Sequence, residues 1–258
     1  MELGISGKVA VVGGSSRGIG KAIAQAFLRE GAHTVITGRD PAALAAARTD
    51  LDEIAGASHV LAVEGDLARL EMLEALEGEV LRKFGATDCL VANVGKGSGT
   101  PGWDVSEAEW AEMLDVTLRT NVRLVQRFLG GMVRAGGGSV VLVGSITGLE
   151  ATKAPMHYSA AKAALASFTK NLARSVGGSG VRVNMVAPGN VLFQGGTWDK
   201  KYREDPAAVR AYLDAEVPLR RFATPEEIAD LVVFLSSPRS AFITGSCVVA
   251  DGGQMRGF

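Results

Sequence analysis

Short apolar runs alternate with stretches of helical periodicity along the whole chain. Seven runs predict strands, at Lys8–Val12, His33–Thr37, His59–Val63, Asp88–Ala92, Ser139–Val143, Val181–Ala187 and Cys247–Ala250. The intervening periodicity predicts helices at Lys21–Glu30, Pro41–Ile54, Leu67–Phe84, Ser106–Val133, Met156–Val176 and Pro225–Ser236. Strands that alternate with helices indicate right-handed βαβ units. We therefore predict one α/β domain over residues 1–258, with a doubly wound parallel sheet of about seven strands and helices on both faces.

Composition narrows the possible partners. Hydrophobic residues make up 47% of the chain, which is enough for a large core. The formal net charge is −1, so electrostatics favour neither nucleic acid nor an anionic membrane, and no apolar run reaches the roughly 18 residues of a membrane span. Cys89 and Cys247 each lie in a predicted strand and are expected to be buried free thiols, which suits a reducing cytoplasm. The absence of a His/Cys cluster argues against a metal site.

A glycine-rich turn follows the first predicted strand. It consists of Gly13-Gly14-Ser15-Ser16-Arg17-Gly18-Ile19-Gly20 and leads into a helix. Glycines at 14, 18 and 20 leave room for a tight turn and for a pyrophosphate to approach the backbone. The start of the helix adds unpaired N–H donors and partial positive charge. Strand, turn and helix in this order predict a dinucleotide site.

A second motif lies on the helix that begins at Met156. Tyr158 and Lys162 are four residues apart and therefore share a helix face. A nearby cation favours phenolate and lowers a tyrosine pKa, so such a tyrosine can exchange a proton with an alcohol or carbonyl. Ser145 follows a predicted strand, at the sheet edge where open α/β sheets bind ligands. His157 either lines this site or faces solvent at the helix start.

Together the two motifs resemble the short-chain dehydrogenase/reductase family, whose members have a Rossmann-like fold. The likeness extends over essentially the whole chain. It includes Asp66-Leu67, Ala92-Asn93-Val94-Gly95, the Ser145, Tyr158 and Lys162 trio, Asn184, Pro188-Gly189 and Asp251-Gly252-Gly253. Within this family, its sequence most resembles those of 3-oxoacyl thioester (acyl-carrier-protein) reductases and of bacterial sugar and polyol dehydrogenases.

The resemblance implies hydride transfer between a nicotinamide cofactor and a carbonyl or alcohol carbon. Tyr158 would be the general acid in reduction, Lys162 would bind the nicotinamide ribose and depress the Tyr158 pKa, and Ser145 would donate to the substrate oxygen. The cofactor contacts that the family pattern implies are Gly14, Ser16, Arg17, Gly18, Ile19, Gly20, Arg39, Asp66, Leu67, Asn93, Gly95, Tyr158, Lys162, Pro188, Gly189 and Val191.

The end of the second predicted strand bears on the choice of cofactor. Relatives that use NAD place an acidic side chain there, whereas this chain has Gly38 followed by Arg39. Arg17 is a second cation, and Asp40 suits the N-cap of the next helix, ahead of Pro41. We expect NADP(H), with NAD less favoured. The alternative is that Arg39 simply points into solvent.

Three positions depart from the family pattern. Thr117 stands where many active members have a catalytic asparagine, and Asn121 lies one turn later on the same face. The hydroxyl of Thr117 is expected to bond back to the carbonyl of Met113. Val94 replaces an alanine, and Phe193 replaces a threonine near the cofactor carboxamide. These changes raise the question of whether Thr117 or Asn121 serves the proton relay.

The sequence indicates less about the substrate than about the cofactor. Arg119, Arg123 and Arg127 form a stripe that either meets an acidic acyl carrier, faces solvent or faces another subunit. Relatives that use a carrier often have a basic residue before the sixth strand, where this chain has Ser179 and Gly180. Three hypotheses follow: an NADP(H)-dependent reductase of 3-oxoacyl thioesters, a sugar or polyol dehydrogenase, and a nucleotide-sensing protein with impaired catalysis.

The resemblance also implies a lid and an assembly. Residues 192–219 are predicted to be irregular, with a short charged helix around Ala207–Ala215 and with Trp198 at the tip. By analogy with the family, this segment would be a mobile lid over a small-molecule substrate. Helices Ser106–Val133 and Met156–Val176 would form the subunit contact of a cytoplasmic homotetramer, where small alanine side chains allow close approach.

Overall fold

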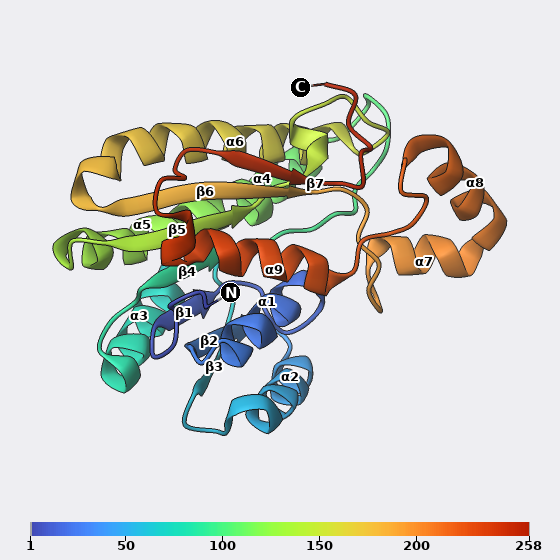
Figure 1. Ribbon diagram of the computed structural model, residues 1–258. Helices are drawn as coiled ribbons and strands as arrows, with labels where there is room; N and C mark the ends of the chain where they lie inside the picture. The colour runs from blue at the N-terminus through green and yellow to red at the C-terminus, as the bar shows by residue number, and fades with distance from the viewer. Residues whose placement is uncertain (1, 258) are drawn as a thin grey trace.

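A seven-stranded parallel sheet forms the centre of the protein, in a computed structural model that describes residues 2–257 (Figure 1). The strands are β1 (Val9–Val12), β2 (His33–Gly38), β3 (Val60–Glu64), β4 (Cys89–Ala92), β5 (Gly138–Val143), β6 (Val181–Pro188) and β7 (Cys247–Ala250). Their order is β3-β2-β1-β4-β5-β6-β7, and every neighbouring pair is parallel. The order reverses between β1 and β4, and such a reversal opens a crevice for ligands at the carboxyl ends of the strands.

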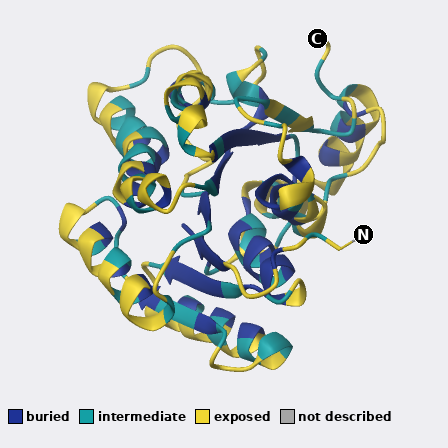
Figure 2. Cartoon of the chain, turned by 60° about the vertical axis from the view of Figure 1, so that its left-hand side comes forward, coloured by how far each residue is buried: buried dark blue, intermediate teal, exposed yellow. Residues whose placement is uncertain are grey.

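Helices cover both faces of the sheet, as the alternating pattern predicts. They are α1 (Gly18–Arg29), α2 (Pro41–Ala55), α3 (Leu70–Phe84), α4 (Glu107–Leu114), α5 (Thr120–Arg134), α6 (Met156–Val176), α7 (Thr197–Glu204), α8 (Pro206–Glu216) and α9 (Pro225–Ser236). One core lies between the sheet and α1, α2 and α9, and the other lies between the sheet and α3, α5 and α6. Buried strands therefore occupy the middle of the molecule, and exposed positions lie on the outer helix faces (Figure 2). The predicted fold class is confirmed.

The predicted helix Ser106–Val133 is not uniform. A π-helical turn, η1 (Asp115–Arg119), joins α4 to α5. The backbone N–H of Thr120 donates to the carbonyl of Asp115, five residues back, and the Thr120 hydroxyl donates to the same oxygen at 2.9 Å. Turns of this kind interrupt α-helices most often at functional sites. This one contains Thr117.

The 192–219 segment is more regular than predicted. The expected charged helix is present as α8, but the sequence pattern missed α7, because its eight residues are nearly all polar and its two aromatic residues are too few to mark a helix. The two helices stand apart from the layers that cover the sheet (Figure 1). A small cluster of Val209, Leu213 and Val217 holds them together, with Trp198, Tyr212 and Phe222 packed against it.

One burial prediction is wrong. Cys89 is buried as expected, but Cys247 is exposed. Cys247 begins β7, which pairs only with β6 and is therefore an edge strand, and side chains alternate between exposed and partly buried along it. The apolar run correctly predicted a strand, but an apolar run does not show whether that strand is covered on both faces. Between residues 2 and 257, no helix has both the length and the apolar character of a membrane span.

Candidate active site

The glycine-rich turn is shaped by close backbone approaches. Gly14 and Gly18 have positive φ angles of 66° and 56°, which side chains rarely adopt. A Cβ on Gly20 would lie 2.6 Å from Nδ2 of Asn93 and closer still to the carbonyl oxygen of Gly14. Asn93 Nδ2 donates to that carbonyl at 2.9 Å, so the end of β4 holds the turn in place.

The turn fits a dinucleotide. Helix α1 begins inside it, at Gly18, and the N-cap residue Arg17 makes no side-chain bond to the first helical N–H groups. A helix start whose first N–H donors are not capped by a side chain suits a diphosphate. Asn93 was predicted as a direct cofactor contact, and the structure shows its amide engaged with the turn itself.

The end of β2 supports the expected cofactor preference. Asp40 accepts from the N–H groups of Ala42 and Ala43 at 3.0 and 3.1 Å, so its carboxylate caps α2 as predicted. Gly38 lies against Ser16, where a Cβ would be 3.2 Å from the serine Oγ. Arg39 is exposed and has no ion-pair partner among residues 2–257. This corner therefore offers a hydroxyl and a cation, and the carboxylate of Asp40 is directed to the helix cap.

Ser145 is positioned with its proton free. It is the residue before a 3-10 turn, Ile146–Gly148, and is 8% exposed. Its Oγ accepts from the N–H of Thr147 at 3.2 Å and from the Thr147 hydroxyl at 3.1 Å. Because both bonds use lone pairs, the serine hydrogen remains able to donate to a substrate oxygen. Sequence reasoning did not single out Thr147; the bond from its N–H to Ser145 is that of an ST turn, which any residue at this position can make.

Close packing of the turn after Ser145 on α6 brings this serine near Tyr158 and Lys162. Gly148 lies directly on α6, where a Cβ would be 2.6 Å from the backbone N of Ala163. The predicted trio of Ser145, Tyr158 and Lys162 is therefore brought together in space, and Ser145 is close enough to Tyr158 to affect its pKa.

The pKa values differ from the expected pattern. Burial raises the pKa of Tyr158, and the hydrogen bond with Ser145 only partly offsets this. Burial also lowers the pKa of Lys162 to about 8. Lys162 Nζ lies 5.8 Å from the centre of the Tyr158 ring and donates to the carbonyl of Val143 at 2.7 Å. Burial therefore outweighs the other influences on the Tyr158 pKa, and the Lys162 side chain is directed to the backbone; its predicted effect on the Tyr158 pKa stays a prediction.

Thr117 and Asn121 are both buried and both engaged elsewhere. The Thr117 hydroxyl donates to Sδ of Met113 at 3.2 Å, not to the Met113 carbonyl as predicted. Asn121 Nδ2 donates to the carbonyls of Val94 and Thr117, each at 2.7 Å, and its Oδ1 accepts from the N–H of Val94 at 3.1 Å. Both amide hydrogens of Asn121 are therefore used.

The other predicted contacts lie around the same edge of the sheet. Asp66 and Leu67 follow β3, and Asp66 Oδ1 accepts from the N–H of Ala68 at 3.1 Å. A Cβ on Gly95 would lie 3.7 Å from Lys162 Nζ. Pro188 ends β6, Gly189 donates its N–H to the carbonyl of Ala250 at 3.0 Å, and Val191 is buried in a bridge to Ala223.

Two aromatic rings, those of Phe193 and His157, lie beside the predicted site. The ring of Phe193 lies over Gly18, where a Cβ would be 2.7 Å from the ring. His157 is 1% exposed, so the solvent-facing alternative is wrong; its ring packs near Trp110 and against Gly99 in the loop after β4. Sequence reasoning noted Phe193 only as a departure from the family, and no sequence signal indicated that it contacts the glycine turn.

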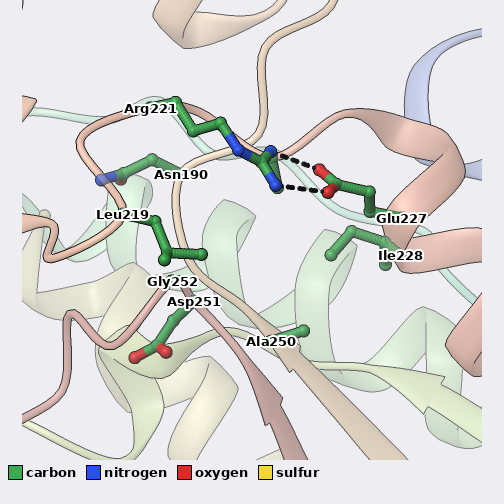
Figure 3. Close-up of a pocket in the computed structure, with 9 residues that line it drawn as sticks. Asn190, Leu219, Arg221, Glu227, Ile228, Ala250, Asp251 and Gly252 are labelled. Carbon is green, nitrogen blue, oxygen red and sulfur yellow. Dashed lines mark hydrogen bonds and ion pairs between the residues drawn. The ribbon is translucent and has the colours of Figure 1, made fainter.

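A cavity of about 160 Å³ is lined by a different set of residues (Figure 3). Asn190, Leu219, Asp251 and Gly252 line it, and Arg221 and Glu227 form an ion pair beside it. The cavity is at the end of the 192–219 segment. None of Ser145, Tyr158 and Lys162 lines this cavity. The candidate active site is therefore identified from the arrangement of these three side chains and not from the cavity.

Known proteins resemble the chain over its full length. A family model described as enoyl-(acyl carrier protein) reductase matches residues 14–255. The 3-oxoacyl-(acyl-carrier-protein) reductase FabG of Vibrio cholerae is 35% identical over 98% of this chain and 99% of its own. Acetoacetyl-CoA reductase of Synechocystis is 34% identical over 98% of both chains. The crystal structure of L-sorbose reductase from Gluconobacter frateurii, complexed with NADPH and L-sorbose, has a TM-score of 0.93 at 35% identity and covers both chains completely.

These likenesses agree with the Rossmann-like sheet, the glycine turn, the buried Ser145 and Lys162 and the partly buried Tyr158. The chain belongs to the short-chain dehydrogenase/reductase family and is an oxidoreductase that acts on CH–OH groups.

Proposed function

We propose that the protein is an NADPH-dependent reductase that converts a ketone to a secondary alcohol, with a 3-oxoacyl thioester as its preferred substrate class. The observation that carries the proposal is the meeting of Ser145, Tyr158 and Lys162 at the sheet edge that also holds the glycine turn. The free serine hydrogen, the protonated phenol and the buried amine provide the donors that carbonyl reduction needs. The names of the FabG and acetoacetyl-CoA reductase relatives support the thioester class.

Each residue of the trio has a distinct task in this proposal. The bound cofactor would supply the hydride. Ser145 would donate to the substrate oxygen while accepting from Thr147, which fixes the direction of its own hydrogen. Tyr158 would transfer its proton to that oxygen, and its raised pKa keeps it protonated at neutral pH. Lys162 would exchange its bond to Val143 for one to the nicotinamide ribose.

At the opposite end of the cofactor site, an exposed Arg39 and the nearby Ser16 would bind the 2′-phosphate of NADPH. The engagement of Asp40 in the helix cap supports this preference, because it directs that carboxylate to the N–H groups of α2. The sorbose reductase structure, which contains NADPH, is consistent with it.

A second candidate substrate is a ketose or a similar polar ketone. The arginine stripe that would dock an acidic carrier is neutralised within the chain: Arg119 pairs with Asp115, and Arg127 pairs with Glu74 and Glu77. Arg123 donates to the carbonyl of Ala68. A carrier protein would therefore meet little free positive charge there. The likeness to L-sorbose reductase supports this candidate.

The two candidates separate in one substrate panel. Acetoacetyl-CoA, a short 3-oxoacyl thioester without a carrier, L-sorbose and D-fructose would be offered with NADPH or NADH, and oxidation of the cofactor followed at 340 nm. The proposal expects thioester turnover with NADPH, and Tyr158→Phe should reduce it by about 10²–10⁴-fold. Turnover of ketoses alone would replace the first candidate by the second. Tyr158→Phe activity within tenfold of wild type would overturn the assigned role of Tyr158.

We also propose a cytoplasmic homotetramer. On α6, Ala160 and Ala163 are exposed and would allow close approach of a second helix, and on the β7 side Phe242 and Val249 expose apolar surface. Sedimentation equilibrium would test this, and a monomeric mass at micromolar concentration would contradict it.

A further inference from the structure

Tyr212 connects three parts of the chain that are far apart in sequence. Its hydroxyl oxygen accepts from Asn190 Nδ2 at 3.2 Å and from Gln254 Nε2 at 2.8 Å. Asn190 Nδ2 also donates to Gln254 Oε1 at 2.8 Å, which closes a triangle of side chains. One corner is on α8, one directly follows Pro188-Gly189 at the end of β6, and one is near the C-terminus.

Helices α7 and α8 depend on few contacts with the rest of the molecule. They pack chiefly on each other, through the small cluster around Leu213. The ring of Tyr212 stacks on Trp198 of α7 with centroids 4.9 Å apart. Tyr212 therefore bonds to the body of the protein through its hydroxyl and to α7 through its ring. Trp198, expected at the lid tip, is instead part of this internal packing.

The C-terminal residues reinforce the same attachment. The N–H of Leu219 donates to the carbonyl of Gly252 at 3.1 Å, and Arg256 pairs with Glu216 of α8. Glu150, in the loop that follows Ser145, accepts from the backbone N–H of Arg256 at 2.8 Å. The chain end thus lies between the 192–219 segment and the loop that carries the catalytic serine.

The attached segment reaches the catalytic edge of the sheet. A Cβ on Gly97, in the loop after β4, would lie 3.6 Å from the hydroxyl of Thr197 at the start of α7, and the same loop lies against Lys162 at Gly95 and against His157 at Gly99. A shift of α7 and α8 would therefore alter the space available to a ketone beside Tyr158. It would change the cofactor turn far less, because Asn93 holds that turn independently.

We propose that Tyr212 is a positioning residue that fixes α7 and α8 against Asn190 and Gln254 and thereby sets ketone binding. The proposal rests on the proposed reductase function. Loss of the hydroxyl would leave two partly buried amide donors without their acceptor, which is the costly way to break a hydrogen bond. The stack on Trp198 would survive in phenylalanine.

The test compares Tyr212→Phe with Tyr202→Phe, a matched change at an exposed tyrosine of α7. We expect Tyr212→Phe to raise KM for the ketone about tenfold, to change kcat by less than threefold and to leave the Kd for NADPH within twofold. Tyr202→Phe should change none of these. An unchanged KM in Tyr212→Phe, or an equal loss of NADPH affinity, would overturn the proposal.

A second readout needs no turnover. Lys200, Lys201 and Arg203 are exposed trypsin sites on α7, so cleavage there reports how often this helix opens. In unliganded protein, Tyr212→Phe and Gln254→Leu should each speed this cleavage several-fold, and the double variant should be no faster than the faster single one. Equal rates in wild type and Tyr212→Phe would reject the coupling. If wild type reduces no ketone while cleavage responds as expected, the proposed function fails and the positioning role stands.

Discussion

The side-chain amide of Asn121 brackets the backbone of Val94. It accepts from the N–H at 3.1 Å and donates to the carbonyl at 2.7 Å, and its second hydrogen goes to Thr117. The loop after β4 is therefore held by a residue that lies one helical turn beyond the usual catalytic asparagine position. Asn121 has no hydrogen left for a relay water, and Thr117 directs its hydroxyl to Met113.

Thr117→Asn should raise kcat for ketone reduction, by about two- to tenfold, because an asparagine amide has two donors to offer a relay water. The solvent isotope effect on kcat should be larger in wild type than in the variant. Thr117→Val is the matched control: it removes a hydroxyl that already bonds a sulfur, so kcat should stay within twofold. A large loss of kcat in Thr117→Val would show that the threonine hydroxyl serves the relay itself.

Arg39→Asp should erase or reverse the preference for NADPH. Charge-assisted bonds to a phosphate contribute about 1.5–3 kcal/mol, or about 10–150-fold in affinity, and the carboxylate would repel the phosphate. Measured kcat/KM for NADPH and NADH provides the test. Arg29→Asp, the same change at the exposed end of α1, is the control and should keep the wild-type ratio. Equal efficiency of wild type with both cofactors would reject the role of Arg39.

The two reaction directions should differ in their pH dependence. Burial raises the pKa of Tyr158, so the phenol that reduction needs stays protonated below its ordinary value near 10. Reduction at saturating ketone should therefore be nearly constant from pH 6 to about 8. Alcohol oxidation needs the phenolate and should increase steadily with pH over the same range. A fall in kcat for reduction with an apparent pKa near 7 would indicate that cofactor binding lowers the Tyr158 pKa.

Phe193→Ala should speed the release of NADPH. The Phe193 ring lies over Gly18, at the start of the helix that would bind the diphosphate, and its removal would open that side to water. We expect dissociation to be about tenfold faster, measured by stopped-flow fluorescence of NADPH. Phe193→Leu keeps an apolar cover and should stay within threefold of wild type. Slower dissociation from Phe193→Ala would mean that the ring competes with the cofactor for this place.

The sequence correctly predicted those features that depend on residues close together in the chain. Alternating runs predicted every strand of the sheet, and the Asp40-Pro41 pair predicted the start of α2. Tyr158 and Lys162 share a face because helix geometry requires it, so their pairing was also predictable.

Properties that depend on neighbours from elsewhere in the chain were not predictable. The exposure of Cys247 depends on which strand ends at the sheet edge, and the raised pKa of Tyr158 depends on the material that buries it. The Tyr212 triangle joins residues 22 and 42 positions away from the tyrosine. No spacing rule connects them, since their meeting follows from the return of the chain end to the sheet.

The cap formed by Asp40 has a consequence for coenzyme engineering. An acidic residue near the end of β2 can both start the next helix and bind the ribose. Here separate positions are available for these two roles. Asp40 starts α2, while Gly38 lies against Ser16 and Arg39 is the residue that we propose for the 2′-phosphate. Substitutions at residues 38 and 39 can therefore change the preference for a coenzyme while the Asp40 cap of α2 stays intact. Coenzyme specificity and the stability of this helix can thus be altered independently.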